Sequence, residues 1–206
     1  MKQRKLEMLL EEIESFSDPE LELEQYQTPS TLAAEILHFA YMQGDLDDSV
    51  QDLGCGTGIL AIGAKFLGAT KVVGYDTDPK ALEIAGKNAR KLGTEVEFIF
   101  SDVADIKEHV KTTLMNPPFG SRVKGRDRPF LSSALRTSDI IYSIHNRGSL
   151  AFIQKFIKPA VITHSYVAKF PLKRIFDFHK KEREVIEVEI YRIAVSVYDS
   201  KFSTAT

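Results

Sequence analysis

The stretch Ser49–Gly58, with the sequence SVQDLGCGTG, decides the fold of this chain. It starts with an apolar strand pattern and ends with three glycines spaced by one residue, and a helical apolar pattern follows at 59–64. Glycine allows positive φ angles and lets a ligand approach the main chain closely, while the N-terminus of the next helix offers free N–H groups. The stretch therefore predicts a strand, a turn that holds a ligand, and a helix.

An acidic residue follows in the position that a nucleoside-binding turn requires. A second strand pattern at 71–75 ends at Asp76, eighteen residues after Gly58. A carboxylate there can accept hydrogen bonds from both hydroxyls of a ribose. The spacing differs from the dinucleotide fingerprint Gly-x-Gly-x-x-Gly, because the third glycine falls one residue early. The alternative is a tight turn without a ligand.

The rest of the chain alternates between strand and helix patterns, which predicts a Rossmann-like α/β fold: a doubly wound, mostly parallel sheet covered on both faces. Helices are predicted over 4–16, 28–43, 58–67, 79–92, 130–137 and 147–157, and strands over 49–53, 71–75, 95–100, 111–115, 139–144, 160–167, 171–184 and 185–198. Thr28 is expected to cap its helix, with Pro29 at the first helical position. The final strand follows its neighbour as in a hairpin, so it is expected to be antiparallel.

A second informative segment, Asn116–Gly120 (NPPFG), follows the apolar strand pattern at 111–115. Two prolines stop the strand and force an extended, stiff path. The Asn116 amide oxygen and the Pro117 carbonyl can accept hydrogen bonds from a planar amino group, while the Phe119 ring can cover a flat π-face. The segment suits an exocyclic amine on a base. The alternative is a rigid surface loop that packs its Phe on the core.

Composition places limits on the function. The chain has 206 residues, 43% hydrophobic and 27% charged, which is typical of one globular domain, and its net charge of −2 excludes a wholly basic nucleic-acid binder. Two local basic clusters, at 122–128 and 169–183, could neutralise phosphates or be ordinary solvated loops.

Further classes of protein are disfavoured. Cys55 is the one cysteine, so no internal disulfide is expected, and no apolar stretch approaches the length of a membrane span. The five histidines lack metal-ligand spacing, so no metal is expected. A cytoplasmic protein is the expectation.

Together these motifs resemble the class I S-adenosylmethionine-dependent methyltransferases that carry Asn-Pro-Pro-aromatic, specifically methyltransferase-like protein five and its archaeal relatives. Further matching segments are 24–29, 76–78, 101–103, 142–145 and 178–181. The chain departs from the family at Thr57, where a cysteine is usual, and at Gln27, where a proline is usual. Neither change removes a donor or acceptor that the chemistry requires.

The resemblance implies a seven-stranded sheet with an antiparallel last strand, and a single methyltransferase domain, 1–206, in which N-terminal helices (1–45) cover the cofactor site of a Rossmann-like core (46–206). It implies S-adenosylmethionine as cofactor and methylation of the exocyclic N6 of an adenine in structured RNA, most simply small-subunit ribosomal RNA. The base would be single-stranded or flipped. A small zinc-binding activator subunit that shields a sheet edge is also implied, and no membrane is involved.

The expected site residues fall into three groups. Those expected to act on the amine are Asn116, Pro117, Pro118 and Phe119. The cofactor residues are Gly54, Thr57 and Ile59 for the methionine end, Asp76 for the ribose, Asp102 and Val103 for the adenine, and Gln25 and Thr28 as a cover. The expected RNA contacts are Arg122, Lys124, Arg126, Lys180 and Lys181.

Other functions remain open at this point. The same segment occurs in enzymes that methylate a glutamine amide of release factors or guanine N2 in RNA, although Phe119 rather than Tyr favours adenine. An NAD-dependent oxidoreductase is disfavoured by the glycine spacing. A scaffold that binds the cofactor without catalysis is the third alternative.

Overall fold

The computed structural model describes residues 1–16, 26–119, 125–173 and 183–195. Its strands are β1 (Ser49–Leu53), β2 (Lys71–Asp76), β3 (Glu97–Phe100), β4 (Val110–Met115), β5 (Ser138–Asn146), β6 (Val161–Lys173) and β7 (Arg183–Ala194). They form a seven-stranded sheet in the order β3-β2-β1-β4-β5-β7-β6. β7 runs antiparallel to both β5 and β6, and the other neighbours pair in parallel. The predicted mixed α/β sheet with an antiparallel last strand is confirmed.

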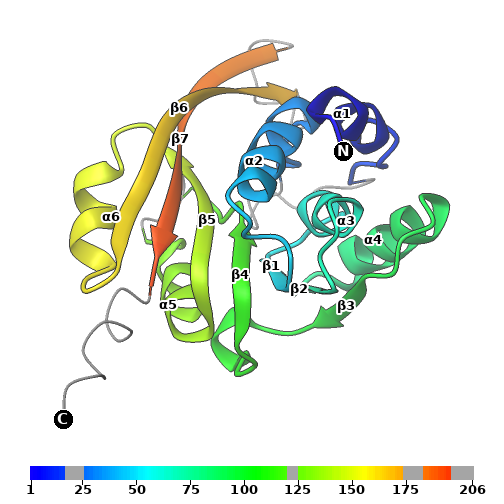
Figure 1. The fold of residues 1–206 in the computed structure, drawn as a ribbon. Helices are drawn as coiled ribbons and strands as arrows, with labels where there is room; N and C mark the ends of the chain where they lie inside the picture. Colours follow the sequence, from blue (N-terminus) through cyan, green and yellow to red (C-terminus); the bar gives the residue numbers. More distant parts are fainter. Residues whose placement is uncertain (17–25, 120–124, 174–182, 196–206) are drawn as a thin grey trace.

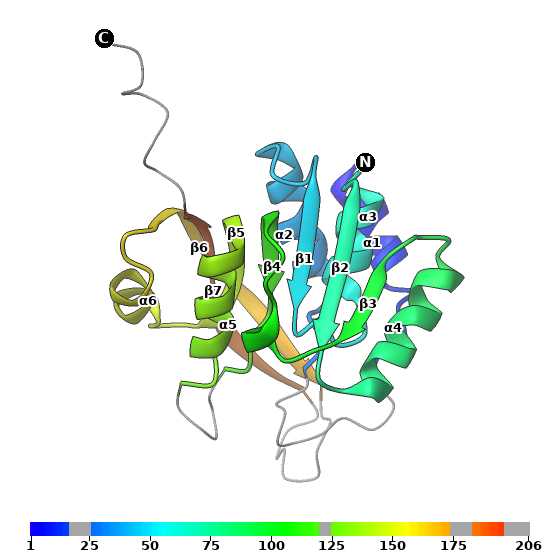
Figure 2. The same ribbon diagram turned by 90° about the horizontal axis from the view of Figure 1, so that it is seen from below.

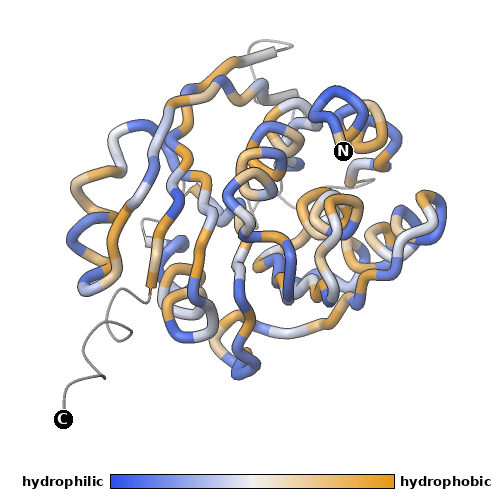
Figure 3. Tube along the Cα trace, viewed as in Figure 1, coloured by the Kyte–Doolittle hydropathy of each residue, from blue (hydrophilic) through white to orange (hydrophobic). Residues whose placement is uncertain are grey.

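Helices cover both faces of this sheet, as Figures 1 and 2 show. They are α1 (Gln3–Leu10), α2 (Ser30–Met42), α3 (Ile59–Phe66), α4 (Pro79–Lys91), α5 (Arg128–Thr137), α6 (Leu150–Phe156) and the short 3₁₀ helix η2 (Val103–Asp105). One buried cluster joins α1–α4 to the sheet, and a second joins η2, α5 and α6 to the opposite face. In Figure 3 α3 is apolar over most of its length, whereas α1 and α4 carry hydrophilic stretches. This matches the burial of α3 from Ile59 to Ala64.

The parallel strands bring the glycine turn and the NPPFG segment together at the carboxyl ends of the strands. β1 and β4 are hydrogen-bonded neighbours, and Leu53 pairs with Met115. In Figure 2 the arrowheads of β1, β2 and β3, which mark these carboxyl ends, point to the same side of the molecule. Gly54 and Asn116 each follow the last residue of their strand, so they leave the sheet at the same level.

A chain of buried polar side chains, here called the polar ladder (Gln51, Thr113, Thr137 and Ser138), crosses three strands. Gln51 Nε2 donates to Thr113 Oγ1 at 2.8 Å and to Thr137 Oγ1 at 2.7 Å. Thr113 in turn donates to Ser138 Oγ at 2.8 Å. All four residues are buried, so these bonds satisfy donors that would otherwise be costly to desolvate.

Several predicted boundaries are wrong, each for a local reason. β6 is one strand from Val161 to Lys173, where the sequence predicts two strands over 160–167 and 171–184. It also contains Pro171, which an edge strand tolerates because one of its sides is unpaired. The first helix ends at Leu10 rather than at residue 16. The N-cap of α2 is Pro29 and not Thr28, whose hydroxyl is used elsewhere.

In the described part of the chain, no helix has the length and apolar character needed to span a bilayer.

Candidate active site

The glycine turn between β1 and α3 is held against the end of β2. Gly54, Gly56 and Gly58 have φ angles of 69°, 52° and 88°, a region that other residues adopt only with strain. The Gly54 N–H donates to the Tyr75 carbonyl at 2.9 Å, and the Gly56 N–H donates to Asp76 Oδ2 at 2.8 Å. The predicted turn and the predicted acid are therefore directly bonded.

Two aromatic rings occupy the space that the absent glycine side chains leave. A Cβ on Gly54 would lie 2.9 Å from Phe130 Cε1, and a Cβ on Gly56 would lie 2.8 Å from Phe16 Cζ. Phe130 belongs to α5, and Phe16 belongs to the segment after α1. Both rings line the cavity that opens beside the turn.

That larger cavity has a volume of about 530 Å³, a size typical of sites for drug-sized ligands. Of the residues expected from the sequence, those that line it are Gly54, Asp76, Asp102, Val103, Asn116, Pro118 and Arg126. They come from the ends of β1, β2, β3 and β4 and from the residues before α5. The structure thus brings the expected ribose and adenine contacts together with the amine segment.

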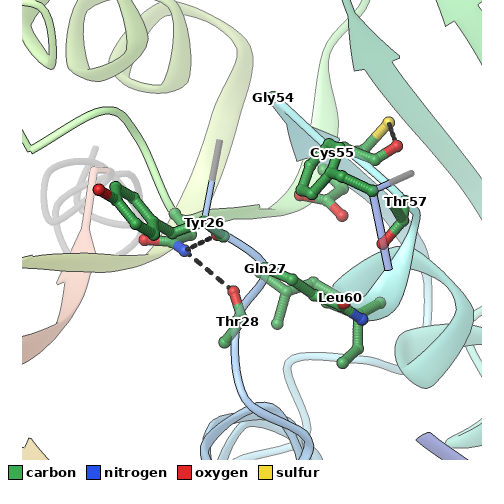
Figure 4. Close-up of a pocket in the computed structure, with 12 residues that line it drawn as sticks. Tyr26, Gln27, Thr28, Gly54, Cys55, Thr57 and Leu60 are labelled. Carbon is green, nitrogen blue, oxygen red and sulfur yellow. Dashed lines mark hydrogen bonds between the residues drawn. The ribbon is translucent and has the colours of Figure 1, made fainter. Parts of the chain in front are cut away.

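A smaller cavity of about 40 Å³ adjoins the glycine turn (Figure 4). Expected residues that line it are Thr28, Gly54, Thr57, Ile59 and Asn116. In Figure 4 the segment with Tyr26, Gln27 and Thr28 lies across from the turn with Gly54, Cys55 and Thr57. The buried Thr57 hydroxyl has no hydrogen-bond partner among the described residues, so a polar ligand group can be bound there.

The orientation of the Asn116 amide is fixed by its neighbours. Its Nδ2 donates to Thr28 Oγ1 at 3.0 Å and reaches the Tyr26 carbonyl at 3.5 Å, as the dashed lines in Figure 4 show. A carbonyl can only accept, so the nitrogen must face it. The Asn116 Oδ1 atom is then buried with no partner in the described residues. Leaving a buried acceptor unsatisfied costs about 1–3 kcal/mol, which a ligand donor would recover.

The remaining residues of the NPPF segment differ in their surroundings. Pro117 is buried, and Pro118 lines the larger cavity. The Phe119 ring packs edge-on against Phe170 of β6, with centroids 5.8 Å apart, and the Phe119 carbonyl accepts a bond from Asn146 Nδ2 at 3.3 Å. The ring does not line either cavity, so its stacking on a base stays a prediction.

The two acids expected to bind the adenosyl part already accept backbone bonds. Asp76 accepts from Gly56 and Asp78 N–H groups, but desolvation outweighs these bonds and raises the pKa of its carboxyl. Asp102 Oδ1 accepts from the Ala104 N–H at 2.8 Å and so caps η2. This oxygen of Asp102 therefore acts as a helix cap.

Sequence reasoning missed Asp52, a residue of β1 that lines the smaller cavity. It is 1% exposed, and its Oδ2 accepts a bond from the Ala61 N–H at 3.1 Å. Desolvation raises the pKa of this carboxyl to about 7. Its position two residues before the first glycine was the available signal.

Five of the expected site residues lie outside the part of the chain that the structure describes. Gln25, Arg122, Lys124, Lys180 and Lys181 lie outside the described ranges. Within those ranges no group of three or more His, Cys, Asp or Glu residues is arranged to hold a metal ion. His145 is buried and contacts Ser143 Oγ at 2.5 Å, in keeping with a core role.

The sheet order, the glycine turn with its acid, and the two adjoining cavities define a class I methyltransferase, the class that uses S-adenosylmethionine. Comparison with known proteins agrees. The profile of the ribosomal protein L11 methyltransferase (PrmA) family matches residues 31–115. That match ends one residue before Asn116.

Full-length relatives identify the family. Mettl5 of Drosophila melanogaster, named an rRNA N(6)-adenosine-methyltransferase, is 34% identical over 95% of this chain and 97% of its own length. The protein MJ0284 of Methanocaldococcus jannaschii is 39% identical over 98% of this chain and 99% of its own length. The crystal structure of PH1948 from Pyrococcus horikoshii, a candidate RNA methyltransferase, superposes with a TM-score of 0.88 at 38% identity, covering 94% and 98% of the two chains. The chain belongs to the family of METTL5 and its archaeal relatives.

Proposed function

We propose that this protein transfers a methyl group from S-adenosylmethionine to the exocyclic N6 of an adenine in ribosomal RNA. The observation that carries this proposal is the buried, unpartnered Oδ1 of Asn116, a residue that lines both cavities. Relatives named rRNA N(6)-adenosine-methyltransferases in fly, zebrafish and nematode support the substrate. Small-subunit RNA is the finer proposal.

The described residues fit S-adenosylmethionine. The ribose hydroxyls would bond to Asp76, which keeps unused lone pairs, and the adenine would lie by Asp102 and Val103. The methionine end would enter the smaller cavity beside Thr57 and Ile59. We propose that Gly54 and Thr28 also contact the cofactor, together with Gln25, which lies outside the described residues. When bound, the cofactor supplies an activated methyl that passes to N6 while its sulfur keeps the bonding electron pair.

Asn116 and Pro117 would prepare the nitrogen for attack. The lone pair of an exocyclic amine is delocalised into the ring, which makes the amine a poor nucleophile. Bonds from its two hydrogens to Asn116 Oδ1 and the Pro117 carbonyl favour a pyramidal nitrogen with its lone pair directed at the methyl. The methylated nitrogen is briefly cationic and releases its proton readily, so no strong general base is required.

The target adenine must leave its stack to reach this position. Pro118 would pack beside it, and Phe119 would stack on it after moving from Phe170, a contact worth about 1–3 kcal/mol. Arg126, which lines the larger cavity, is proposed to contact the RNA backbone. We extend this proposal to Arg122, Lys124, Lys180 and Lys181, which lie outside the described residues.

We further propose that residues 1–206 act as one methyltransferase domain in the cytoplasm, with residues 1–45 covering the cofactor site. A zinc-binding activator subunit would pair with a sheet edge. β3 is an edge strand, and its last residue, Phe100, is 65% exposed. An exposed strand edge with a large apolar side chain is a surface that a partner can cover.

The test compares methylation with cofactor binding in Asn116→Ala. Removing one transition-state hydrogen bond should lower labelled-methyl transfer to ribosomal RNA by about 100-fold or more. Calorimetric affinity for S-adenosylhomocysteine should remain within about threefold of the wild-type value, because most cofactor contacts are retained. Label that appears on a protein glutamine or on guanine, with none on adenine, would overturn the proposal. Unchanged transfer in the variant would indicate that Asn116 has no role in the reaction.

A further inference from the structure

The two cavities share a junction, lined by the residues common to both: Phe16, Tyr26, Gly54, Gly56 and Asn116. Under the proposed function, the smaller cavity holds the methionine end of the cofactor and the larger one the adenosyl end. The sulfonium joins these two ends, so it must lie at the junction. Phe16, which the sequence analysis did not place in the site, is one of two aromatic residues there.

Phe16 reaches the junction through a segment here called the strap, residues 11–16, which follows α1. Within the strap Ile13 is 7% exposed and belongs to the main core cluster. The ring at its end lies against the bare face of Gly56, close enough that a Cβ there would be only 2.8 Å from Phe16 Cζ. Ring and ligand therefore share the main-chain face of the glycine turn.

Asn88 of α4 holds the strap in place. It is 1% exposed, and its amide oxygen accepts a bond from the Glu14 N–H at 2.9 Å. Its Nδ2 donates to the Glu14 carbonyl at 3.1 Å and to the Thr57 carbonyl at 3.0 Å. One buried amide thus ties the strap to the glycine turn, and Lys91 Nζ adds a bond to the Glu12 carbonyl at 2.8 Å. Hydrogen bonds from α4 to the main chain at Glu12 and Glu14 therefore fix the strap just before Phe16.

The charge of the ligand changes during the reaction. S-adenosylmethionine carries a positive sulfonium, whereas its product S-adenosylhomocysteine is a neutral thioether. The carboxyl groups of Asp52 and Asp76 line the smaller and the larger cavity respectively, and an aromatic ring at the junction attracts a cation more strongly than a neutral thioether. We propose that Phe16 selects the charged cofactor over the neutral product at this junction, and that Asn88 is the positioning residue for its ring. This inference rests on the proposed function.

The experiment measures dissociation constants by calorimetry for S-adenosylmethionine, S-adenosylhomocysteine and sinefungin, which carries an ammonium in place of the sulfonium. Phe16→Leu keeps an apolar side chain but removes the ring. We expect it to weaken binding of the two cations by about threefold to thirtyfold and to weaken binding of the neutral product by a clearly smaller factor. Phe16→Tyr, which keeps a ring, should retain the wild-type preference. Phe156→Leu, at a half-buried Phe on α6 outside both cavities, is the matched control and should change nothing.

Asn88→Ala should also reduce the preference for the cations, measured as the ratio of the dissociation constant of the neutral product to that of each cation. A loss of stability alone would leave this ratio unchanged. Combined with Phe16→Leu it should cause no further loss of selectivity, because both changes remove one interaction. If Asn88→Ala does not fold, the Phe16 variants decide the question alone. Equal weakening for all three ligands in Phe16→Leu, or no weakening, would overturn the inference. Wild-type protein that binds none of the three ligands would instead overturn the proposed function.

Discussion

Substituting Asp52 by Asn should change how the stability of the protein depends on pH. Asp52 is fully buried in β1, and burial raises the pKa of its carboxyl to about 7 from 3.8. Asn has nearly the same shape and keeps an oxygen that can accept the Ala61 N–H bond. It carries no titratable group, so the variant isolates the cost of ionising this one carboxyl.

The direction of the effect follows from the raised pKa. The folded state holds the Asp52 proton more tightly than the unfolded state, so the stabilisation is complete below pH 3.8 and is lost as pH rises through about 7. The full loss is about 4 kcal/mol, since each pKa unit corresponds to about 1.4 kcal/mol. Between about pH 5.5 and about pH 8 the wild type should lose about 2 kcal/mol relative to Asp52→Asn.

Urea denaturation of both ligand-free proteins at a series of pH values measures this difference. Asp47→Asn is a suitable control, because Asp47 is exposed and its Lys111 partner lowers the pKa of its carboxyl. Its contribution is present above the unfolded pKa and is lost only as pH falls below it, so this variant should parallel the wild type over the same range. If Asp52→Asn also parallels the wild type, the carboxyl is not held neutral by burial and the reasoning fails.

Three further substitutions test packing and binding. Gly63→Ala places a Cβ 2.3 Å from Leu37 Cδ1 in the core and should destabilise the protein by about 1–3 kcal/mol in urea denaturation. Gly86→Ala is the control: its Cβ would meet only the end of the Arg90 side chain, at 3.3 Å, so this variant should be neutral or stabilising. Asp45→Ala removes the buried partner of Arg192 Nε, 2.8 Å away, and should cost about 3–5 kcal/mol by the same measurement; a loss under about 1 kcal/mol would contradict this. Asp76→Asn should weaken S-adenosylmethionine binding by about tenfold or more in calorimetry, because charge-assisted bonds are lost; unchanged affinity would remove Asp76 from the ribose site.

Much of the fold was predictable because its signals are local. The SVQDLGCGTG stretch gave the first strand, the turn and the helix, and Asp76 lies where the strand pattern placed it, bonded to the Gly56 N–H. The adjacency of β1 and β4 came from resemblance to the family, since hydrophobic patterns do not encode strand order. The two strands predicted over 160–167 and 171–184 are one strand, β6, because pairing with β7 continues along its whole length, and only the assembled sheet determines that pairing.

The parts of the site that escaped prediction depend on long-range contacts. Thr28 has the residue type and spacing of a helix cap, yet its hydroxyl accepts from Asn116, which is 88 positions away in the sequence. In the sequence, Asn88 is an ordinary helix residue and Phe16 is one more apolar position in a helical pattern. In the structure, Asn88 bonds to Glu14 of the strap, 74 positions away. Composition and periodicity contain no signal for such contacts.

The polar ladder has a consequence for the reaction geometry. Sliding β1 past β4 by one residue would carry Gln51 away from Thr113 and Thr137, leaving desolvated donors without acceptors. The same slip would move Asn116 by about 3.3 Å relative to Gly54. A misplacement of about 1 Å can lower the rate of an enzymatic reaction by about a hundredfold. The polar ladder lies in the core, yet it thereby fixes the separation that the proposed transfer from methyl donor to acceptor requires.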